Sequence, residues 1–64
     1  MKVTLKAARV NAGMTQPEAA EALGIGVQTI INYETGKISP RIDTVLKMVD
    51  LYGVPLDEID FKEG

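Results

Sequence analysis

Apolar residues recur at spacings of three and four along most of the chain, which is the period of amphipathic helices. The first such stretch follows Thr4, a residue that can cap a helix, and runs to Asn11 or Ala12. Leu5, Ala8 and Ala12 fall on one face of it. The glycine that comes next suits the left-handed backbone conformation that ends many helices. We therefore predict a first helix over this stretch.

A capping box begins the second predicted helix. The Thr15 hydroxyl can accept a hydrogen bond from the backbone N–H of Glu18, and the Glu18 carboxylate can reach back to the backbone of Thr15. Pro17 falls in the first turn, where its missing N–H costs no intrahelical hydrogen bond. Small and aliphatic residues are expected to point inward from this helix, and a glycine is expected to end it. These residues are Ala19, Ala20 and Leu23, followed by Gly24.

The second and third predicted helices are joined by a turn of very few residues. Two glycines in the segment Gly24-Ile25-Gly26 let the chain reverse sharply, and Ile25 can anchor the turn in the core. A third helix is predicted over about Val27–Glu34, with Ile30 pointing inward. Because so short a turn forces two helices to cross steeply, residues 15–35 are predicted to form a helix-turn-helix.

A fourth helix is predicted to begin at Ser39-Pro40 and to end at Gly53. Its apolar residues again recur at spacings of three and four, as in a helix with one face in the core. They are Ile42, Val45, Met48, Val49 and Tyr52. Val54-Pro55 is predicted to open a last short helical turn, and residues 60–64 are expected to fray.

The composition fits one small all-α domain spanning residues 1–64, of which 45% are hydrophobic. The chain contains no cysteine and no histidine, which excludes a disulfide framework and a cysteine–histidine metal site. The commonest catalytic base and the best nucleophile are therefore missing, and the carboxylates are scattered over different predicted helices. The sequence predicts neither an enzyme nor a cofactor-binding protein.

No apolar run approaches the roughly 18 residues that a membrane-spanning helix needs. The first ten residues, MKVTLKAARV, lack the hydrophobic region and cleavage site of a signal peptide. We therefore expect a cytoplasmic protein with no membrane partner. A chain of 64 residues can hardly enclose a pocket, so we also expect no small-molecule substrate.

The formal net charge of −2 is unevenly distributed along the chain. Residues 1–47 carry six basic and four acidic side chains, a net +2, whereas residues 48–64 carry one basic and five acidic side chains, a net −4. Charges separated by more than the Debye length, about 8 Å at physiological salt, are largely screened. An acidic end that is distant from a binding face therefore does little to repel a polyanion from that face.

The order and spacing of several segments resemble those of the Cro/C1/Xre-type helix-turn-helix family, which includes phage Cro proteins and repressor DNA-binding domains. The segments are LKAARVNAGMTQPEAAEALGI, QTIINYETGK, the proline before the fourth helix, and LYGVPLDEI. The resemblance covers the chain from Leu5 to about Ile59. It implies a compact five-helix, lambda-repressor-like fold whose third helix is a recognition helix in the major groove of double-stranded DNA. It also implies a homodimer on DNA, formed through the fourth helix and the C-terminal turn.

Within that resemblance, four residues of the third helix are candidates for reading bases, and four others for contacting the DNA backbone. The base-reading candidates are Val27, Gln28, Thr29 and Asn32, since Gln or Asn can bond N6 and N7 of adenine and Val can pack on a thymine methyl. The backbone candidates are Gln16, Lys37, Arg41 and Lys6. The family also pairs an arginine of the first helix with a glutamate after the third, which corresponds here to Arg9 and Glu34.

The chain departs from the family pattern at three positions. Ala19 stands where leucine is usual, so that part of the core is either thinner or filled by a neighbour such as Met14. Gly26 stands at the usual Ser or Thr cap of the recognition helix, and Ile31 stands where a polar residue is common. Ile31 is consistent with a partner contact, a contact to a DNA methyl group, or simple exposure.

Less specific interpretations stay open for the same residues. Gln28 and Asn32 are also consistent with ordinary solvated side chains, and Lys37 and Arg41 with a solubilising loop. The function we expect is that of a sequence-specific DNA-binding transcriptional regulator that acts by operator occupancy. The alternative is a protein-binding module on the same fold, such as an antitoxin-like or adaptor domain. The net negative charge, the uncharged recognition helix and Ile31 favour this alternative.

Overall fold

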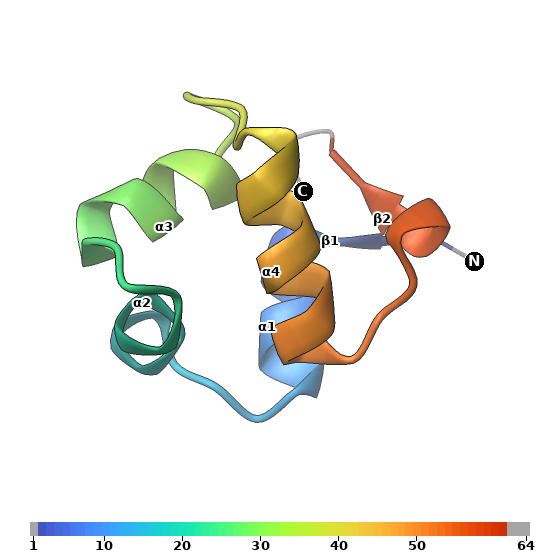
Figure 1. Ribbon diagram of the computed structural model, residues 1–64, viewed down its shortest axis with the longest axis horizontal. Helices are drawn as coiled ribbons and strands as arrows, with labels where there is room; N and C mark the ends of the chain where they lie inside the picture. Colours follow the sequence, from blue (N-terminus) through green and yellow to red (C-terminus); the bar gives the residue numbers. More distant parts are fainter. Residues whose placement is uncertain (1, 62–64) are drawn as a thin grey trace.

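Four α-helices and one pair of very short strands make up the computed structural model, which describes residues 2–61. In chain order the elements are β1 (Val3–Thr4), α1 (Leu5–Asn11), α2 (Gln16–Leu23), α3 (Val27–Glu34), α4 (Ile42–Tyr52), a 3-10 turn (Leu56–Glu58) and β2 (Ile59–Asp60). Helices α2 and α3 lie at one end of the molecule and the strands at the other, with α1 and α4 between them (Figure 1). All four predicted α-helices are therefore present.

Local capping chemistry fixes where the helices begin and end. The Thr4 hydroxyl accepts a hydrogen bond from the backbone N–H of Ala7 at 3.0 Å and caps α1. Both halves of the predicted capping box are formed at the start of α2, where the Thr15 N–H donates to Glu18 Oε1 at 2.9 Å. These hydrogen bonds lower the pKa of the Glu18 carboxyl. Helix α2 ends at Gly24, whose φ of +71° is the left-handed conformation that favours glycine.

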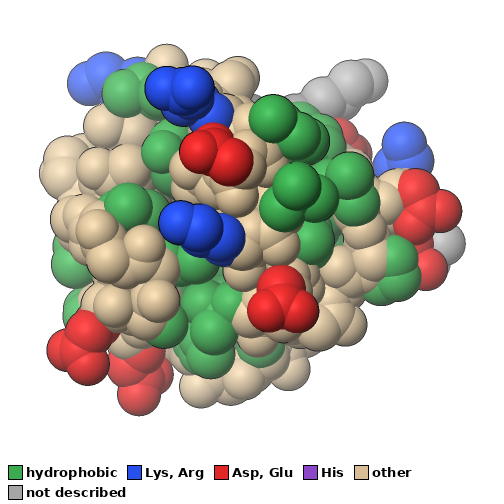
Figure 2. Space-filling model, in the orientation of Figure 1, with side chains coloured by type: hydrophobic (Ala, Val, Ile, Leu, Met, Phe, Trp, Pro, Cys, Tyr) green, Lys and Arg blue, Asp and Glu red, His purple; other side chains and the backbone are tan. Residues whose placement is uncertain are grey.

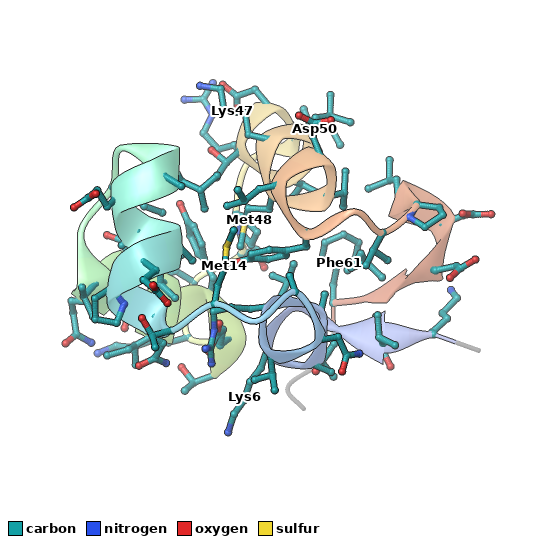
Figure 3. All side chains as sticks on the ribbon, turned by 90° about the horizontal axis from the view of Figure 1, so that it is seen from below. Lys6, Met14, Lys47, Met48, Asp50 and Phe61 are labelled. Carbon is teal, nitrogen blue, oxygen red and sulfur yellow. The ribbon has the colours of Figure 1, made fainter. Side chains whose placement is uncertain are left out.

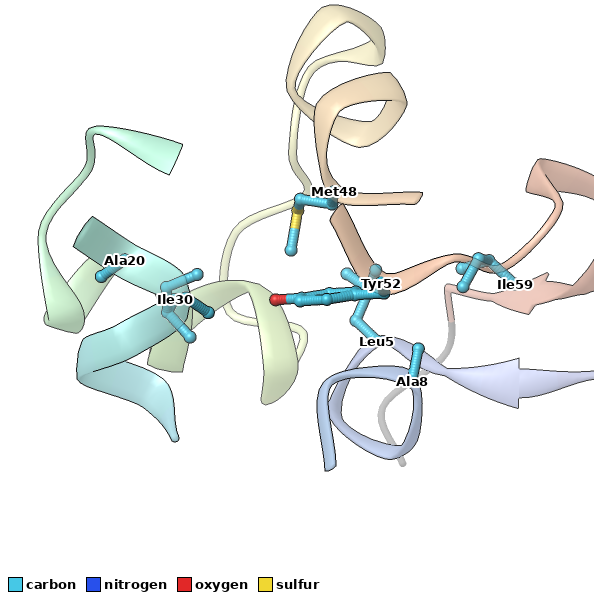
Figure 4. Close-up of a cluster of buried hydrophobic side chains, with 8 residues drawn as sticks. Leu5, Ala8, Ala20, Ile30, Met48, Tyr52 and Ile59 are labelled. Atoms are coloured by element: carbon cyan, nitrogen blue, oxygen red, sulfur yellow. The ribbon is translucent and has the colours of Figure 1, made fainter. Parts of the chain in front are cut away.

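The core lies where α1, α2, α3 and α4 meet. Its buried side chains come from all four helices and from β2 (Figure 4). They are Leu5, Ala8, Ala19, Ala20, Ile30, Met48, Tyr52 and Ile59. Met14 and Met48 point into this region in Figure 3, and Met14 packs against the cluster that contains Ala19. Met14, a flexible side chain, therefore packs against the cluster in which alanine stands at position 19.

The prediction of a fifth helix is wrong. After Pro55 the described chain makes only a three-residue 3-10 turn before it becomes extended. Val3 then pairs with Ile59, and Thr4 with Asp60, in a parallel ladder. This pairing makes a longer helix impossible there and shows that fraying does not begin at Asp60. Phe61 follows β2 with no regular secondary structure, and residues 62–64 of the segment expected to fray lie outside the described residues.

One predicted helix start and two predicted inward-facing residues are also wrong. Helix α4 begins at Ile42, two residues later than expected, because Arg41 is extended and occupies the cap position. Ile42 is 65% exposed and lies outside the core, on the side of α4 that also carries the exposed Leu46 one turn later. Ala12, expected on the inward face of the first helix, is exposed, although its backbone N–H still donates to the carbonyl of Ala8 at 3.0 Å.

Candidate nucleic-acid interface

Helices α2 and α3 are connected by the short turn that the two glycines allow. The backbone N–H of Ile25 donates to the carbonyl of Ala20 at 3.0 Å, and the Ile25 side chain packs against the core cluster. Helix α3 follows after Gly26, with Ile30 fully buried on its inner side. The turn and this buried residue fix α3 against the rest of the domain, so that its other side is presented to solvent.

The outer side of α3 carries uncharged side chains. Val27 is 38% exposed and Gln28 is exposed, while Thr29 and Asn32 are half-buried. Gln28 Nε2 donates to Asn32 Oδ1 at 3.1 Å, across one turn of the helix. Side chains four residues apart are neighbours on a helix surface, which explains why these two amides meet. The four candidate base-reading residues therefore occupy one helix, and two of them are joined to each other.

The first turn of α3 lacks a side-chain cap. Gly26 occupies the cap position in an extended conformation and makes no side-chain hydrogen bond there. This agrees with the departure from the family pattern that the sequence shows at this residue. The start of α3 is consequently less stabilised than the start of α2, which has a complete capping box.

The last residue of α3 joins a buried polar cluster. Arg9 Nε donates to Glu34 Oε2 at 2.7 Å, and Arg9 Nη2 donates to Glu34 Oε1 at 3.3 Å. Arg9 Nη1 donates to the carbonyl of Met14 at 2.8 Å. Gln16 Nε2 also donates to Glu34 Oε1, at 3.1 Å. We call Arg9, Gln16 and Glu34 the buried polar cluster; it joins α1, the start of α2 and the end of α3.

This cluster satisfies a charge pair that would otherwise be costly to bury. Arg9 and Glu34 are 7% and 8% exposed, so the attraction between them and the additional hydrogen bonds must offset their lost hydration. The Tyr52 hydroxyl is buried nearby without a hydrogen-bond partner in residues 2–61, and it points toward Ile30 in Figure 4. Burial, with a smaller effect of the Glu34 charge, raises the pKa of Tyr52 to about 12.

The candidate backbone-contacting cations lie on two separate parts of the molecule. Lys37 and Arg41 are exposed in the segment between α3 and α4. Arg41 Nε lies 4.0 Å from Asp43 Oδ1, and both side chains are well exposed, so this pair is weak and easily exchanged for another anion. Lys6 is exposed on α1 and extends away from the core in Figure 3.

Sequence reasoning missed the hydrogen bond between Gln16 and Glu34. The two residues are 18 positions apart and are brought together only by the packing of α2 on α3. No local spacing predicts such a contact, although a buried glutamate that faces an arginine has acceptor capacity left for a third group. Gln16, expected only to contact a phosphate, is therefore also part of the buried polar cluster.

A family model described as helix-turn-helix matches residues 5–59 of the chain. The chain belongs to the helix-turn-helix family. The Cro/C1-type resemblance seen in the sequence is thereby confirmed. No solved structure is significantly similar to the chain.

Several relatives of this helix-turn-helix protein carry names that refer to transcription. The HTH-type transcriptional regulator ImmR of Bacillus subtilis is 51% identical over 53 residues, which cover 83% of this chain and 42% of ImmR. The cryptic phage CTXphi transcriptional repressor RstR of Vibrio cholerae is 41% identical over 51 residues, which cover 80% of this chain and 46% of RstR. The chain thus spans less than half the length of these two relatives.

A third relative is similar to the chain over most of its own length. It is an uncharacterized HTH-type transcriptional regulator of Methanocaldococcus jannaschii, 37% identical over 59 residues, which cover 92% of this chain and 89% of the relative. A helix-turn-helix domain of this size therefore also occurs in a relative with little additional chain.

The helix-turn-helix domain also exposes apolar side chains away from α3. Hydrophobic side chains gather beside acidic and basic ones on the face drawn in Figure 2, where α4 lies in front. Ile42 and Leu46 of α4 are exposed, as are Ile38 before it and Leu56 and Phe61 after it. Ile38, Ile42 and Phe61 contribute to a pocket of about 270 Å³. Exposed apolar groups of this kind commonly belong to interaction surfaces.

Two other kinds of site are not found in the part of the chain that the structure describes. None of the helices in residues 2–61 has the length and apolar character that crossing a membrane requires. In the same residues, no three side chains of metal-binding type are grouped so that they could hold an ion.

Proposed function

We propose that the protein is a sequence-specific double-stranded DNA-binding transcriptional regulator that acts by operator occupancy. The observation that carries the proposal is the asymmetry of α3. Its inner side is fixed by Ile30 and Glu34, and its outer side offers hydrogen-bonding amides without charges of their own. A helix held in this way and inserted into the major groove meets base edges that differ in their donors and acceptors.

In this proposal Gln28 and Asn32 read bases, and Val27 and Thr29 lie beside them. An amide matches N6 and N7 of adenine, and the exposed Val27 side chain suits the methyl group of thymine. Each good bidentate contact contributes roughly 1–3 kcal/mol of discrimination between bases. Ile31, which is half-buried, is assigned no contact.

Gln16, Lys37, Arg41 and Lys6 are proposed to contact the DNA backbone. Gln16 uses Nε2 to bond Glu34, which leaves its second Nε2 hydrogen and its carbonyl oxygen for other partners. Lys37 and Arg41 follow α3 and supply positive charge where the helix itself has none. With so few cations per protomer, we expect a shallow dependence of affinity on salt.

A homodimer is proposed to bind two half-sites through the surface of α4 and the C-terminal turn. This surface exposes Ile42, Leu46 and Leu56, which a second protomer would cover. A dimer would double the base and phosphate contacts of a domain that has few of each. Half-site centres about one helical turn of DNA apart, roughly 34 Å, suit such an arrangement.

Selection from a randomised duplex library with the purified protein at moderate salt tests the proposal. We expect enrichment of an inverted repeat with half-site centres about 10 base pairs apart. Gln28→Ala should then relax the sequence preference, while Lys37→Ala should weaken binding to all sequences alike. The absence of enrichment at any salt concentration would contradict the proposal, and equal patterns of loss in both variants would contradict the division of roles.

A second candidate function is that of a protein-binding module on the same fold. The apolar residues around α4 and the net charge of −2 favour it. Gel filtration with and without duplex DNA separates the two candidates, because only the DNA-binding protein moves to an earlier elution volume with the duplex.

A further inference from the structure

The hydrogen bond between the side-chain amides of Gln28 and Asn32 limits which bases these two residues can recognise. We propose that Gln28 and Asn32 act as one unit, in which Asn32 orients the Gln28 amide to select adenine and itself selects against cytosine at the adjacent base pair. This inference rests on the proposed function, because it concerns how the same helix reads DNA. In it, Asn32 is a positioning residue for Gln28 as well as a contact of its own.

The chemistry starts from the number of hydrogen-bonding groups in each amide. Gln28 Nε2 carries two hydrogens, and one of them is donated to Asn32 Oδ1 at 3.1 Å. The second hydrogen and Oε1 stay available as an adjacent donor and acceptor. That pair matches the N7 acceptor and the N6 donor of adenine, whereas guanine offers two acceptors at the same edge.

The hydrogen bond also decides what Asn32 presents to the groove. Because Asn32 Oδ1 is turned toward Gln28, the Nδ2 amino group is left to face a second base. An amino group requires an acceptor, which guanine, adenine and thymine offer in the major groove through N7, O6 or O4. Cytosine offers its N4 amino group there, so that two donors would face each other. The unit therefore rejects cytosine next to the selected adenine.

The contact between the two amides bears on which bases they can reach together. Because the amides are hydrogen-bonded to each other, the base edges that they meet must also be neighbours. A free glutamine side chain adopts many rotamers, and ordering it costs binding free energy. A partner one helical turn away that already holds the amide removes part of that cost.

The side chain of Asn32 can be replaced without removing the hydrogen bonds that its backbone carbonyl accepts. The Asn32 carbonyl accepts from the backbone N–H of Ile38 at 3.2 Å, and the Thr35 hydroxyl lies 3.5 Å from the same oxygen. Both contacts involve only the main chain of Asn32. Variants at this residue are therefore expected to fold, and melting curves followed by circular dichroism verify this before binding is measured.

The decisive experiment compares Asn32→Ala with Asn32→Asp. Once the wild-type operator has been selected, duplexes that differ at the adenine position and at its neighbour are titrated with each variant. Asn32→Ala should lower the preference for adenine by about twofold, because Gln28 loses its orienting acceptor and a pair of this kind contributes little. Asn32→Asp keeps an acceptor for Gln28, so the adenine preference should be unchanged. The neighbouring preference should change to cytosine, since a carboxylate accepts from N4.

A matched cycle with Gln28→Ala provides the control. In that background, Asn32→Ala should no longer alter selectivity at the adenine position, because the amide that Asn32 orients is gone. Unchanged adenine preference in the single variant Asn32→Ala would overturn the proposed unit, as would an unchanged neighbouring preference in Asn32→Asp. If the wild-type protein selects no sequence at all, the proposed function fails; if it selects an operator whose preferences are independent of Asn32, only the proposed unit fails.

Discussion

The polar side chains at the two ends of α3 differ in burial and in hydrogen bonding. At its C-terminal end, Glu34 is buried and accepts hydrogen bonds from Arg9 and Gln16. Near its N-terminal end, Gln28 donates one hydrogen bond to Asn32 at the surface. The first arrangement fixes the helix to α1 and α2, and the second leaves amide donors and an acceptor unused at the surface. One helix of eight residues is therefore held firmly at one end and still offers polar groups where it is proposed to meet DNA.

The free energies involved differ by about an order of magnitude. Removing one partner of a buried ion pair leaves an uncompensated charge and costs about 3–5 kcal/mol. A polar pair four residues apart on an exposed helix surface contributes only about 0.2–0.5 kcal/mol. Substitutions at the two ends of α3 should therefore separate folding from binding.

The largest effect is expected for Glu34→Ala. The variant leaves the Arg9 guanidinium buried without its carboxylate, so the free energy of unfolding should fall by about 3–5 kcal/mol. Denaturant titration followed by circular dichroism measures the loss, and the double variant with Arg9→Met should recover part of it. A loss below about 1 kcal/mol, or no coupling between Arg9 and Glu34, would contradict the structural role of the buried polar cluster.

A pH-dependent effect is expected from the tyrosine beside that cluster. The folded-state pKa of about 12 exceeds the ordinary value of 10.0, so the protonated phenol is favoured in the folded state. Ionisation of Tyr52 therefore does not lower the free energy of unfolding below about pH 10. As the pH rises from 10 toward 12, the free energy of unfolding falls by about 1.4 kcal/mol per pH unit. Unfolding free energies of wild type and Tyr52→Phe between pH 8 and 11 measure the difference.

The same variant isolates the cost of the buried hydroxyl. At neutral pH, Tyr52→Phe should be as stable as the wild type or more stable by about 1 kcal/mol, because it removes an oxygen that lacks a partner in residues 2–61. Above pH 10 its stability should decline less than that of the wild type. Parallel decline of both proteins would mean that Tyr52 is ionised as easily in the folded state as in the unfolded one.

Gln28→Ala should weaken base discrimination and leave stability almost unchanged, which is the opposite of what Glu34→Ala should do. We expect a loss of roughly 1–3 kcal/mol in discrimination at one base pair, since the amide would no longer meet its base edge. The free energy of unfolding should change by less than about 0.5 kcal/mol, because the side chain is exposed. Competition binding with matched and mismatched duplexes, beside a denaturant titration, checks both halves. A large loss of stability with unchanged selectivity would reverse the comparison between the two ends of α3.

The smallest effect is expected for Gly26→Ser. Serine can supply the cap that the start of α3 lacks, and a Cβ at this position meets only the Thr29 hydroxyl oxygen, at 3.9 Å. The melting temperature should rise slightly, corresponding to a few tenths of a kcal/mol. Gly26→Ala, which cannot cap, serves as the control. Equal melting temperatures for the two variants would show that no cap had formed.

Most of the fold could be predicted from the sequence because the signals that begin and end the helices involve residues close together in the chain. The capping box at Thr15 and the helix-ending Gly24 and Gly53 depend on neighbours within a few residues, and the structure contains all three features. The predicted fifth helix failed because Ile59 is held by a strand from the other end of the chain. Local patterns cannot reveal such a partner.

The candidate site could be predicted only in part for the same reason. The amides of α3 follow from helix periodicity, and the ion pair of Arg9 was inferred from the family. The hydrogen bond of Gln16 to Glu34 depends on how two helices pack, and the bond from Gln28 to Asn32 depends on side-chain rotamers. The roles of these residues toward DNA remain predictions that the binding experiments test.

The strand pair described above also bears on the kinetics of folding. Val3 and Ile59 lie 56 positions apart, and closing a flexible loop of that length costs about 3.5 kcal/mol of chain entropy before any constant term. Contacts so distant in sequence are expected to form after the helices have packed, so they should stabilise the native state more than the transition state. Stopped-flow measurements on Val3→Ala should accordingly show faster unfolding with an unchanged folding rate. The short ladder between the two ends of the domain would then determine how long the folded protein persists before it unfolds.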